Sequence, residues 1–554
     1  MLSSPTLIVD PHIDDRNRID QEIAELEARL ISLRKARNAL APIARLHPEI
    51  MQEIFYLVHI SSEHKGRGSL LVTWISHKWR ELAHHTSSLW SHIDFKRLEW
   101  IENALSRSKH RELEFELDCT PRQERDLSPL MSLLLKNISR IRRLVMVSRY
   151  GASSQILSES TSEWMAPAPL LVNLQFQRLF LPPRIFSGVC PLLQSLHITS
   201  CAIDWHTLPI TPGLRELVIQ DPNSRTSVEH LVKIFQVIGP GLETLVLEHV
   251  FNQDDSIPLP NLQPTQFRFK KLTQLSLVED TAEEVERLVN RISLPAGGGL
   301  GVEVVVSQYG RSKLAEAFVS SRGIEKWPVK YLDISTDNTS ITIRISEDWS
   351  QMDDCPGDDQ ITDIQFEISD SRQPSELFPI LALSPIHPIK TVVFNGGSYH
   401  PRDKTILSYV GTLGTVRKLH LELAFFPTFR SLIEDQAEKI RQKVYNAPER
   451  GEAENIVELS VAQSILSFHN LEFLEIFGDP VKGQGLTVTD TSSLQRWLEW
   501  RKEFGLPLER FSLVGINVQL PLSWIRTQLR NVVGEVQDRE VTEEDPNDPH
   551  IDGH

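Results

Sequence analysis

The chain has 554 residues, enough for three or four domains of about 150 residues or for one long repeat array. Its residues are 40% hydrophobic and 24% charged, proportions that are typical of a folded protein and exclude a wholly disordered one. The formal net charge of −16 argues against a protein that coats nucleic acid or an anionic membrane.

The cysteines and the apolar runs indicate where the protein acts. Cys119, Cys190, Cys201 and Cys355 show no paired short spacing, so we expect neither a disulfide framework nor a cysteine-rich zinc site. The N-terminus lacks the pattern of a signal peptide, and no segment approaches about 18 uninterrupted apolar residues. We therefore expect an intracellular protein, in the cytoplasm or the nucleus, without a membrane or nucleic-acid partner.

A disordered N-terminus is predicted for residues 1–15, followed by a heptad-like helix over residues 16–40. Its apolar residues recur at alternating spacings of four and three: Ile19, Ile23, Leu26, Leu30, Leu33 and Leu40. Pro42 ends the helix because proline cannot continue the hydrogen-bond ladder. Two interpretations stay open: the helix packs on the next domain, or it forms a coiled coil with a second copy or a partner.

Residues 42–118 read as a compact helical domain with a trailing segment. Helical periodicity covers 48–58 and again 69–85, and the polar stretch 59–68 between them predicts a loop. Pro48 suits the first turn of a helix, where its missing N–H leaves nothing unsatisfied.

From residue 141 a phrase recurs in which apolar residues stand at positions one, four and six. It begins with Ile141, Leu144 and Met146, ends with Leu508, Phe511 and Leu513, and recurs mostly at intervals of 21 to 32 residues. Its last two apolar residues alternate as in a strand with one buried face. One strand and one helix per unit predict a curved leucine-rich-repeat-like α/β solenoid over 119–534. The alternative is an ordinary α/β domain with unrelated buried strands.

Two charged stretches interrupt or follow this array. Residues 434–458 are predicted to form a helix and loop inserted on one repeat. Residues 535–554 hold eight acidic residues against Arg539, a net charge of 1 − 8 = −7, and we expect a disordered acidic tail.

The segment 42–95 resembles the F-box domain in the form common among fungal F-box proteins. The resemblance rests on Leu46, Pro48, Glu49, Ile50, Ile54, Phe55, Ile75, Trp79, Arg80, Ala83, Leu89, Trp90 and Ile93. Trp100 and the phrase Leu105-Ser106-Arg107-Ser108 match a segment that follows the domain in those proteins. His47, Met51 and Ser76-His77 depart from the usual pattern.

The resemblance implies an α+β protein, with a helix and an all-α F-box domain ahead of the repeats. It implies a non-catalytic substrate-recognition subunit that docks the Skp adaptor of a cullin-RING ubiquitin ligase, while the repeats hold an unidentified protein substrate. The residues it implies for the adaptor contact are Leu46, Pro48, Ile50, Ile54 and Ile75. Those expected in the F-box core are Phe55, Trp79, Leu89 and Trp90. The alternative is a leucine-rich-repeat interaction scaffold without ubiquitin transfer.

No motif proposes catalytic, cofactor-binding or metal-binding residues, so we expect no enzyme activity; an enzyme with an unrecognised site remains a further alternative. The histidines His77, His84, His85 and His92 invite a metal hypothesis, but His77 and His84 lie two helical turns apart, too far for one ion. The run Gly297–Gly299 lacks the Lys-Ser/Thr of a phosphate loop and predicts a flexible turn.

Overall fold

The computed structural model describes the residues 13–61, 65–94, 97–119, 124–148, 163–182, 184–252, 267–295, 300–308, 314, 317–318, 321, 331–336, 340–346, 364–369, 389–396, 401–445, 466–478, 485–514, 516, 529 and 532–539. Contacts divide the chain into two compact units. Unit 1 comprises residues 1–195 and 201–209, and unit 2 comprises residues 196–200 and 210–554. No helix among the described residues is both long enough and apolar enough to cross a membrane.

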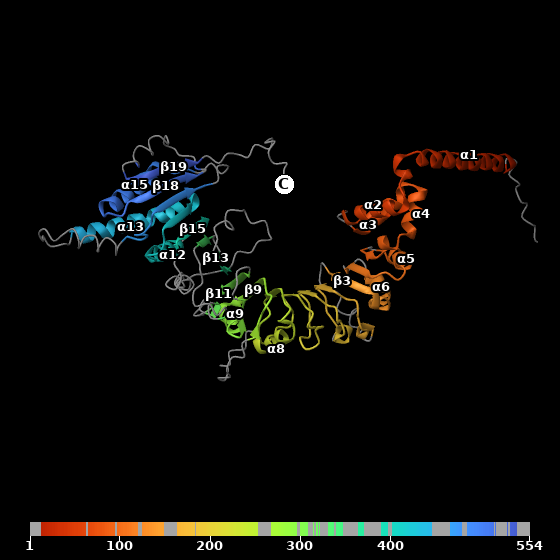
Figure 1. Cartoon of the computed structure of the whole chain (residues 1–554), viewed down its shortest axis with the longest axis horizontal. Coiled ribbons are helices and arrows are strands. Elements are labelled where there is room, and N and C mark those ends of the chain that lie inside the picture. Colours follow the sequence, from red (N-terminus) through yellow and green to blue (C-terminus); the bar gives the residue numbers. More distant parts are fainter. Residues whose placement is uncertain are drawn as a thin grey trace, which may run out of the picture. The chain divides into compact units, whose positions relative to one another are not determined.

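Unit 1 begins with a long helix, α1 (Ile13–Ala39), as predicted for residues 16–40 (Figure 1). The helix starts at Ile13, so residues 13–15 are helical where disorder was predicted, and residues 1–12 lie outside the described residues. Every side chain from 14 to 40 is exposed to solvent. The interpretation in which this helix packs on the next domain is therefore wrong for this structure.

A small helical module follows, with the elements η1 (Pro42–Arg45), α2 (Pro48–Ser61), α3 (Lys65–Ile75), α4 (His77–His85), η2 (Ser87–Trp90) and α5 (Leu98–Ser108). The periodicity over 69–85 covers two helices, because the Ser76 hydroxyl accepts a hydrogen bond from the Trp79 N–H (3.2 Å) and caps α4. The predicted loop 59–68 is mostly helical, since α2 continues to Ser61 and α3 starts at Lys65.

Parallel strands complete unit 1. They are β1 (His92–Ile93), β2 (Leu113–Asp118), β3 (Ile141–Val147) and β4 (Asn173–Gln177), and each pairs with the next in chain order. Helix α6 (Glu124–Lys136) lies between β2 and β3 in the sequence. The parallel strands thus begin at His92, before the residue-119 boundary that the sequence suggested.

Unit 2 continues with parallel strands, of which β5 (Ser195–Thr199) falls at the division between the units. The strands β6 (Glu216–Gln220), β7 (Thr244–Glu248), β9 (Gln274–Thr281) and β11 (Gly301–Gln308) pair in chain order. Their register places Leu217, Leu245 and Leu275 side by side, all fully buried. These are apolar residues that the recurring phrase placed on a buried strand face. In β11, Val302, Val304 and Val306 alternate in the same way and are buried.

The next three strands break the chain order. They are β12 (Tyr331–Thr336), β13 (Ser340–Ser346) and β14 (Ile364–Ser369), and they run in the order β11-β14-β13-β12-β15, with β15 at Thr391–Gly396. Three residues separate β12 from β13, too few for a parallel crossover, so β13 pairs antiparallel with both neighbours. The recurring phrase of the sequence also begins at Val329 and at Ile361. The strands that follow these two starts are therefore not successive repeats in one direction.

Parallel pairing resumes through β16 (Lys418–Glu422), β17 (Phe473–Phe477), β18 (Leu508–Val514) and β19 (Val533–Arg539). The helices α12 (Pro401–Thr412), α13 (Phe426–Tyr445) and α15 (Val488–Glu503) pack in that order beside these strands (Figure 1). Within α13, Ile433, Ala437 and Ile440 are buried. The helix predicted from residue 434 is thus the second half of a packed helix, and residues 446–458 lie outside the described residues.

Helices also cover the first strands of unit 2. Helix α8 (Val228–Ile238) and helix α9 (Ala282–Val289) bury most of their apolar residues, and α9 contacts β9 and β11. A capping box at Thr281 and Glu284 begins α9. Alternating strands and helices agree with the predicted α/β character, although the connections in 163–210 are short 3-10 segments and turns.

Strand β19 overlaps the start of the segment that was predicted to be a disordered tail. Residues 535–539 were expected to be disordered, but they pair with β18, and Arg510 Nε lies 3.1 Å from Glu535 Oε2. Local composition is acidic here, yet the open edge of β18 offers backbone partners that composition alone does not reveal. Residues 540–554 lie outside the described residues.

Truncation after Gly534 is consequently expected to lower the thermal midpoint of unfolding. The deletion removes five residues of β19 and leaves the β18 edge unpaired, a loss of about 1–2 kcal/mol that corresponds to roughly 4 °C. Truncation after Arg539 is the matched control and should leave the midpoint unchanged. Calorimetric traces that are identical for both truncations would contradict a structural role for β19.

Candidate functional site

The helical module has a compact core built on one edge of α2. Met51, Phe55 and His59 follow one another at spacings of four and are all buried, Phe55 completely. The Phe55 ring lies 5.0 Å from the Trp79 ring, centroid to centroid. These contacts place the inner edge of α2 against α4.

Of the four predicted core residues, Phe55, Leu89 and Trp90 have no exposed surface, whereas Trp79 is only half-buried. Trp90 Nε1 donates to the Ala83 carbonyl (2.8 Å), so its polar atom is satisfied inside the core. The guanidinium of Arg107, from the trailing phrase, lies 4.5 Å from the centre of the Trp90 ring. The trailing phrase therefore packs α5 onto η2.

The opposite edge of α2 faces solvent. We name the five residues predicted to contact the adaptor the outer apolar surface: Leu46, Pro48, Ile50, Ile54 and Ile75. Ile50 is 53% exposed and Ile75 57%, Leu46 and Pro48 are exposed, and Ile54 is half-buried. The structure thus separates these residues from the core, as the spacing of Ile50 and Phe55 along α2 requires.

A groove of about 350 Å³ joins part of this surface to the end of α1. Ile43 of η1, Ile75 of α3 and Trp79 of α4 contribute apolar lining, and Lys35 and Lys78 contribute positive charge. Lys78 Nζ donates to the Ala44 carbonyl (3.0 Å) and thereby ties η1 to α4. The groove is apolar at its walls and mainly basic at its rim, where Glu81 is the acidic residue.

Trp74 is an exposed apolar residue that the sequence reasoning missed. It is 66% exposed on α3, and Leu71 and Ile75, three residues before and one after it, are also exposed. The signal was present in the run Leu70-Leu71-Val72-Thr73-Trp74-Ile75, because a helix that is apolar all round must have either two buried faces or a docking face. Val72 occupies the buried face, which leaves Trp74 for the outer one.

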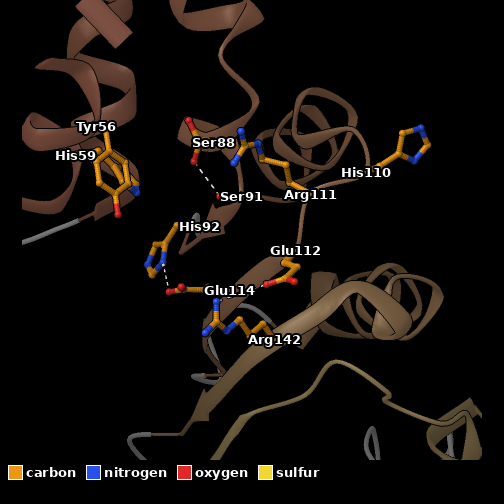
Figure 2. A pocket seen from close by; sticks show the side chains of 10 residues that line it. All are labelled: Tyr56, His59, Ser88, Ser91, His92, His110, Arg111, Glu112, Glu114 and Arg142. Atoms are coloured by element: carbon orange, nitrogen blue, oxygen red, sulfur yellow. Dashed lines mark hydrogen bonds and ion pairs between the residues drawn. The ribbon is translucent and has the colours of Figure 1, made fainter. Parts of the chain in front are cut away.

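A second cavity, of about 610 Å³, lies between α2 and the first strands of unit 1. Figure 2 shows Tyr56 and His59 of α2 on one side and Glu114 and Arg142 on the other, with His92 between them. His92 is buried, its Nδ1 lies 3.1 Å from Glu114 Oε2, and its Nε2 has no hydrogen-bond partner among the described residues. The residues that line the cavity are polar or charged.

The lining of this cavity contains no activated nucleophile among the residues that the structure describes. Ser91 Oγ donates to the Ser88 carbonyl (2.8 Å) rather than to a histidine. Arg142 lies 3.5 Å from Glu112, so the charges of the cavity are partly compensated within it. The arrangement can hold a polar group at His92 Nε2, but it does not assemble a catalytic set.

The histidines of the helical module contact different residues. His77 Nδ1 lies 3.5 Å from Glu81, the His84 ring lies 6.0 Å from the Trp90 ring, and His92 points to Glu114. Burial is the main cause that lowers the pKa of His84, followed by the charges of Arg107 and Arg80. These histidines do not converge on one point.

One group in unit 2 has the composition of a cation site. The ligand atoms of Asp221, Glu248 and His249 lie within 4.8 Å of one another. Asp221 and His249 each follow a strand with positive φ (46° and 50°), and their N–H groups donate to the carbonyls of Glu248 and Val278. These backbone turns place the three side chains together at the ends of the strands. There Asp221 is exposed, and the Glu248 carboxylate accepts a hydrogen bond from the Gln220 side-chain amide.

Burial makes the described cysteines unreactive. Cys119, Cys190 and Cys201 are free thiols with little exposed surface. Burial raises the pKa of Cys119 and of Cys190 to about 12, so both remain protonated at neutral pH. Cys355 lies outside the described residues.

Because Glu279, at the end of β9, is buried, we expect the stability of the protein to depend on pH. Burial raises its pKa to about 8, although the Val250 N–H donates to its carboxylate (2.8 Å). Because the folded-state pKa lies above the unfolded value of about 4.5, the folded state holds the proton more tightly. The contribution of Glu279 to stability should therefore be complete below about pH 4.5. It should fall by a few kcal/mol as the pH rises to about 8.

Glu279→Gln should flatten this dependence, because the amide keeps the shape of the side chain and does not ionise. Thermal midpoints measured between pH 5 and pH 9 test the difference. A variant whose midpoint falls as steeply as that of the wild type would show that another group is responsible.

No family model matches the sequence, and no curated protein matches it.

Proposed function

We propose that the protein is a non-catalytic substrate-recognition subunit of a Skp-cullin-F-box ubiquitin ligase. The observation that supports this best is the division of α2 into two edges. The inner edge, with Phe55, holds the module together, and the outer edge, with Ile50, offers apolar side chains that folding leaves uncovered. A folded domain that keeps such a row of side chains in solvent has a docking site for a partner.

Charge supports an acidic partner such as the Skp adaptor. Residues 42–110 hold nine basic and seven acidic residues, a net charge of 9 − 7 = +2 in a chain of −16. Lys35 and Lys78 flank the groove beside Ile75. Complementary charge steers association, while the apolar contact provides most of the affinity.

The parallel strands that follow the module are proposed to form a leucine-rich-repeat-like solenoid that holds a protein substrate. The residues between the buried positions of each strand point to the opposite face and are free to vary. Several of them pair across neighbouring strands: Arg143 lies 3.9 Å from Glu116, and His420 Nδ1 lies 2.7 Å from Glu475. Such pairs make a polar strand face that suits a hydrophilic segment of a partner protein.

The proposal is tested by reconstitution with purified components. The full chain should bind a Skp adaptor and, through it, a cullin in size-exclusion chromatography. Adaptor binding without cullin would favour the alternative, an interaction scaffold without ubiquitin transfer. Absence of adaptor binding would refute the proposed docking site.

A further inference from the structure

Helix α1 exposes a regular apolar stripe. Its members Ile19, Ile23, Leu26, Leu30 and Leu33 are 53%, 48%, 64%, 47% and 58% exposed, at spacings of four and three residues. This alternation is the seam of a two-stranded coiled coil, in which each such residue fits between residues of a facing helix. In unit 1 the side chains of residues 14–40 remain in solvent, and no described part of the chain covers the stripe.

The charges of α1 are divided along its length. Residues 13–27 hold six acidic and two basic residues, a net charge of 2 − 6 = −4. Residues 28–40 hold four basic and no acidic residues, a net charge of +4. The helix dipole favours this polarity only within the first and last turns, but Glu22, Glu27 and Arg29 lie in the middle. A partner helix with the opposite polarity would neutralise both halves.

A parallel pair of identical helices would be opposed by these charges. In a parallel coiled coil the residues that flank the seam pair with residues five positions later on the partner. These pairs are Asp15 with Asp20, Glu22 with Glu27, and Arg29 with Arg34 of the second copy. All three pairs carry like charges, so a parallel homodimer is disfavoured.

We propose that α1 pairs antiparallel with α1 of a second copy of this chain, centred near Ala28. Reversal about this residue places Ile23 against Leu33 and Leu26 against Leu30 of the second copy, so the centre of the seam stays apolar. At its ends Ile19 meets Arg37 of the second copy. The same reversal lays each acidic half along a basic half. The dimer does not depend on the proposed role in ubiquitin transfer.

Sedimentation equilibrium of the full chain tests the dimer. The wild type should sediment as a dimer at micromolar concentrations, and the double variant Ile23→Asp and Leu30→Asp as a monomer. Ile31→Asp is the matched control, because Ile31 is 53% exposed on the same helix but lies beside the seam. A monomeric wild type, or a double variant that dimerises as well as the control, would overturn the proposal.

The direction of pairing is tested separately by cysteine cross-linking in a Cys355→Ser background. An equimolar mixture of Ile23→Cys and Leu33→Cys chains should cross-link between the two species, while Ile23→Cys alone should not. The opposite pattern would show a parallel dimer.

A charge variant provides a second test of direction. Arg29→Glu with Arg34→Glu should raise the dissociation constant of an antiparallel dimer about tenfold or more, since attractive pairs become repulsive. In a parallel dimer Arg29 would face Arg34 of the second copy. The variant would replace repulsion between positive charges by repulsion between negative charges, so the dissociation constant would change little. An unchanged constant would therefore overturn the antiparallel arrangement.

Discussion

Ile50→Asp is expected to abolish binding of the Skp adaptor while the protein stays folded. Ile50 lies on the outer edge of α2 and is 53% exposed, so its replacement leaves no cavity. It is the third residue of α2, where a negative side chain interacts favourably with the helix dipole. We therefore expect a change in unfolding free energy within about 0.5 kcal/mol.

In the docked complex the same carboxylate would be buried without a partner. An unpaired charge in an apolar interface costs about 3–5 kcal/mol, which weakens binding roughly 100-fold or more. Isothermal titration of the purified chain with a Skp adaptor measures this loss, and circular dichroism monitors the fold.

Two further variants serve as controls for Ile50→Asp. Leu192→Asp places the same charge at an apolar residue of unit 1 that is 49% exposed and lies outside the module, and it should bind the adaptor normally. Phe55→Asp places it in the core and should unfold the module. If a folded Ile50→Asp chain bound the adaptor with wild-type affinity, the outer apolar surface would not be the docking site. The exposed residues Trp74 and Leu71 would then be the next candidate.

Arg501→Met is expected to destabilise unit 2 by about 3–5 kcal/mol. Arg501 is fully buried on α15. Its guanidinium donates to the carbonyls of Phe468, His469 and Leu471 at 2.8, 3.4 and 2.9 Å. Removing it takes one buried donor from each of these carbonyls, of which that of Phe468 keeps the Leu471 N–H.

The charge of Arg501 is retained despite its burial. Burial lowers its pKa to about 10, so the guanidinium is still protonated at neutral pH. The carbonyl dipoles and the Trp497 ring, 5.0 Å from the guanidinium, stabilise that charge. Arg501 therefore holds the turn before β17 against α15.

Arg496→Met is the matched control, because Arg496 lies on the same helix, 5.6 Å from the Trp500 ring, but is exposed. Its loss should change the stability by less than about 0.5 kcal/mol. Urea unfolding followed by tryptophan fluorescence compares the two variants. Equal midpoints would show that the buried hydrogen bonds of Arg501 contribute little.

Local periodicity was sufficient to predict many of the helices and strands and the buried side of several of them. The different sides of Ile54 and Phe55 need only helical geometry, and the alternation in Leu245 and Leu247 needs only the pleat of a strand. The separation of Ile50 from Phe55 followed from the same geometry. These inferences held because each depends on residues that are close in sequence.

Only the tertiary structure decided which elements meet. The exchange of β12 and β14 depends on a hairpin that the repeat phrase does not encode, and β19 is ordered by the edge of β18 despite its acidic composition. Trp79 and Trp74 lie on neighbouring helices, five residues apart, yet Trp79 packs on Phe55 and Trp74 faces solvent. Such outcomes depend on partners that are distant in sequence, whereas a pattern along the chain records only the side of each element that must be covered.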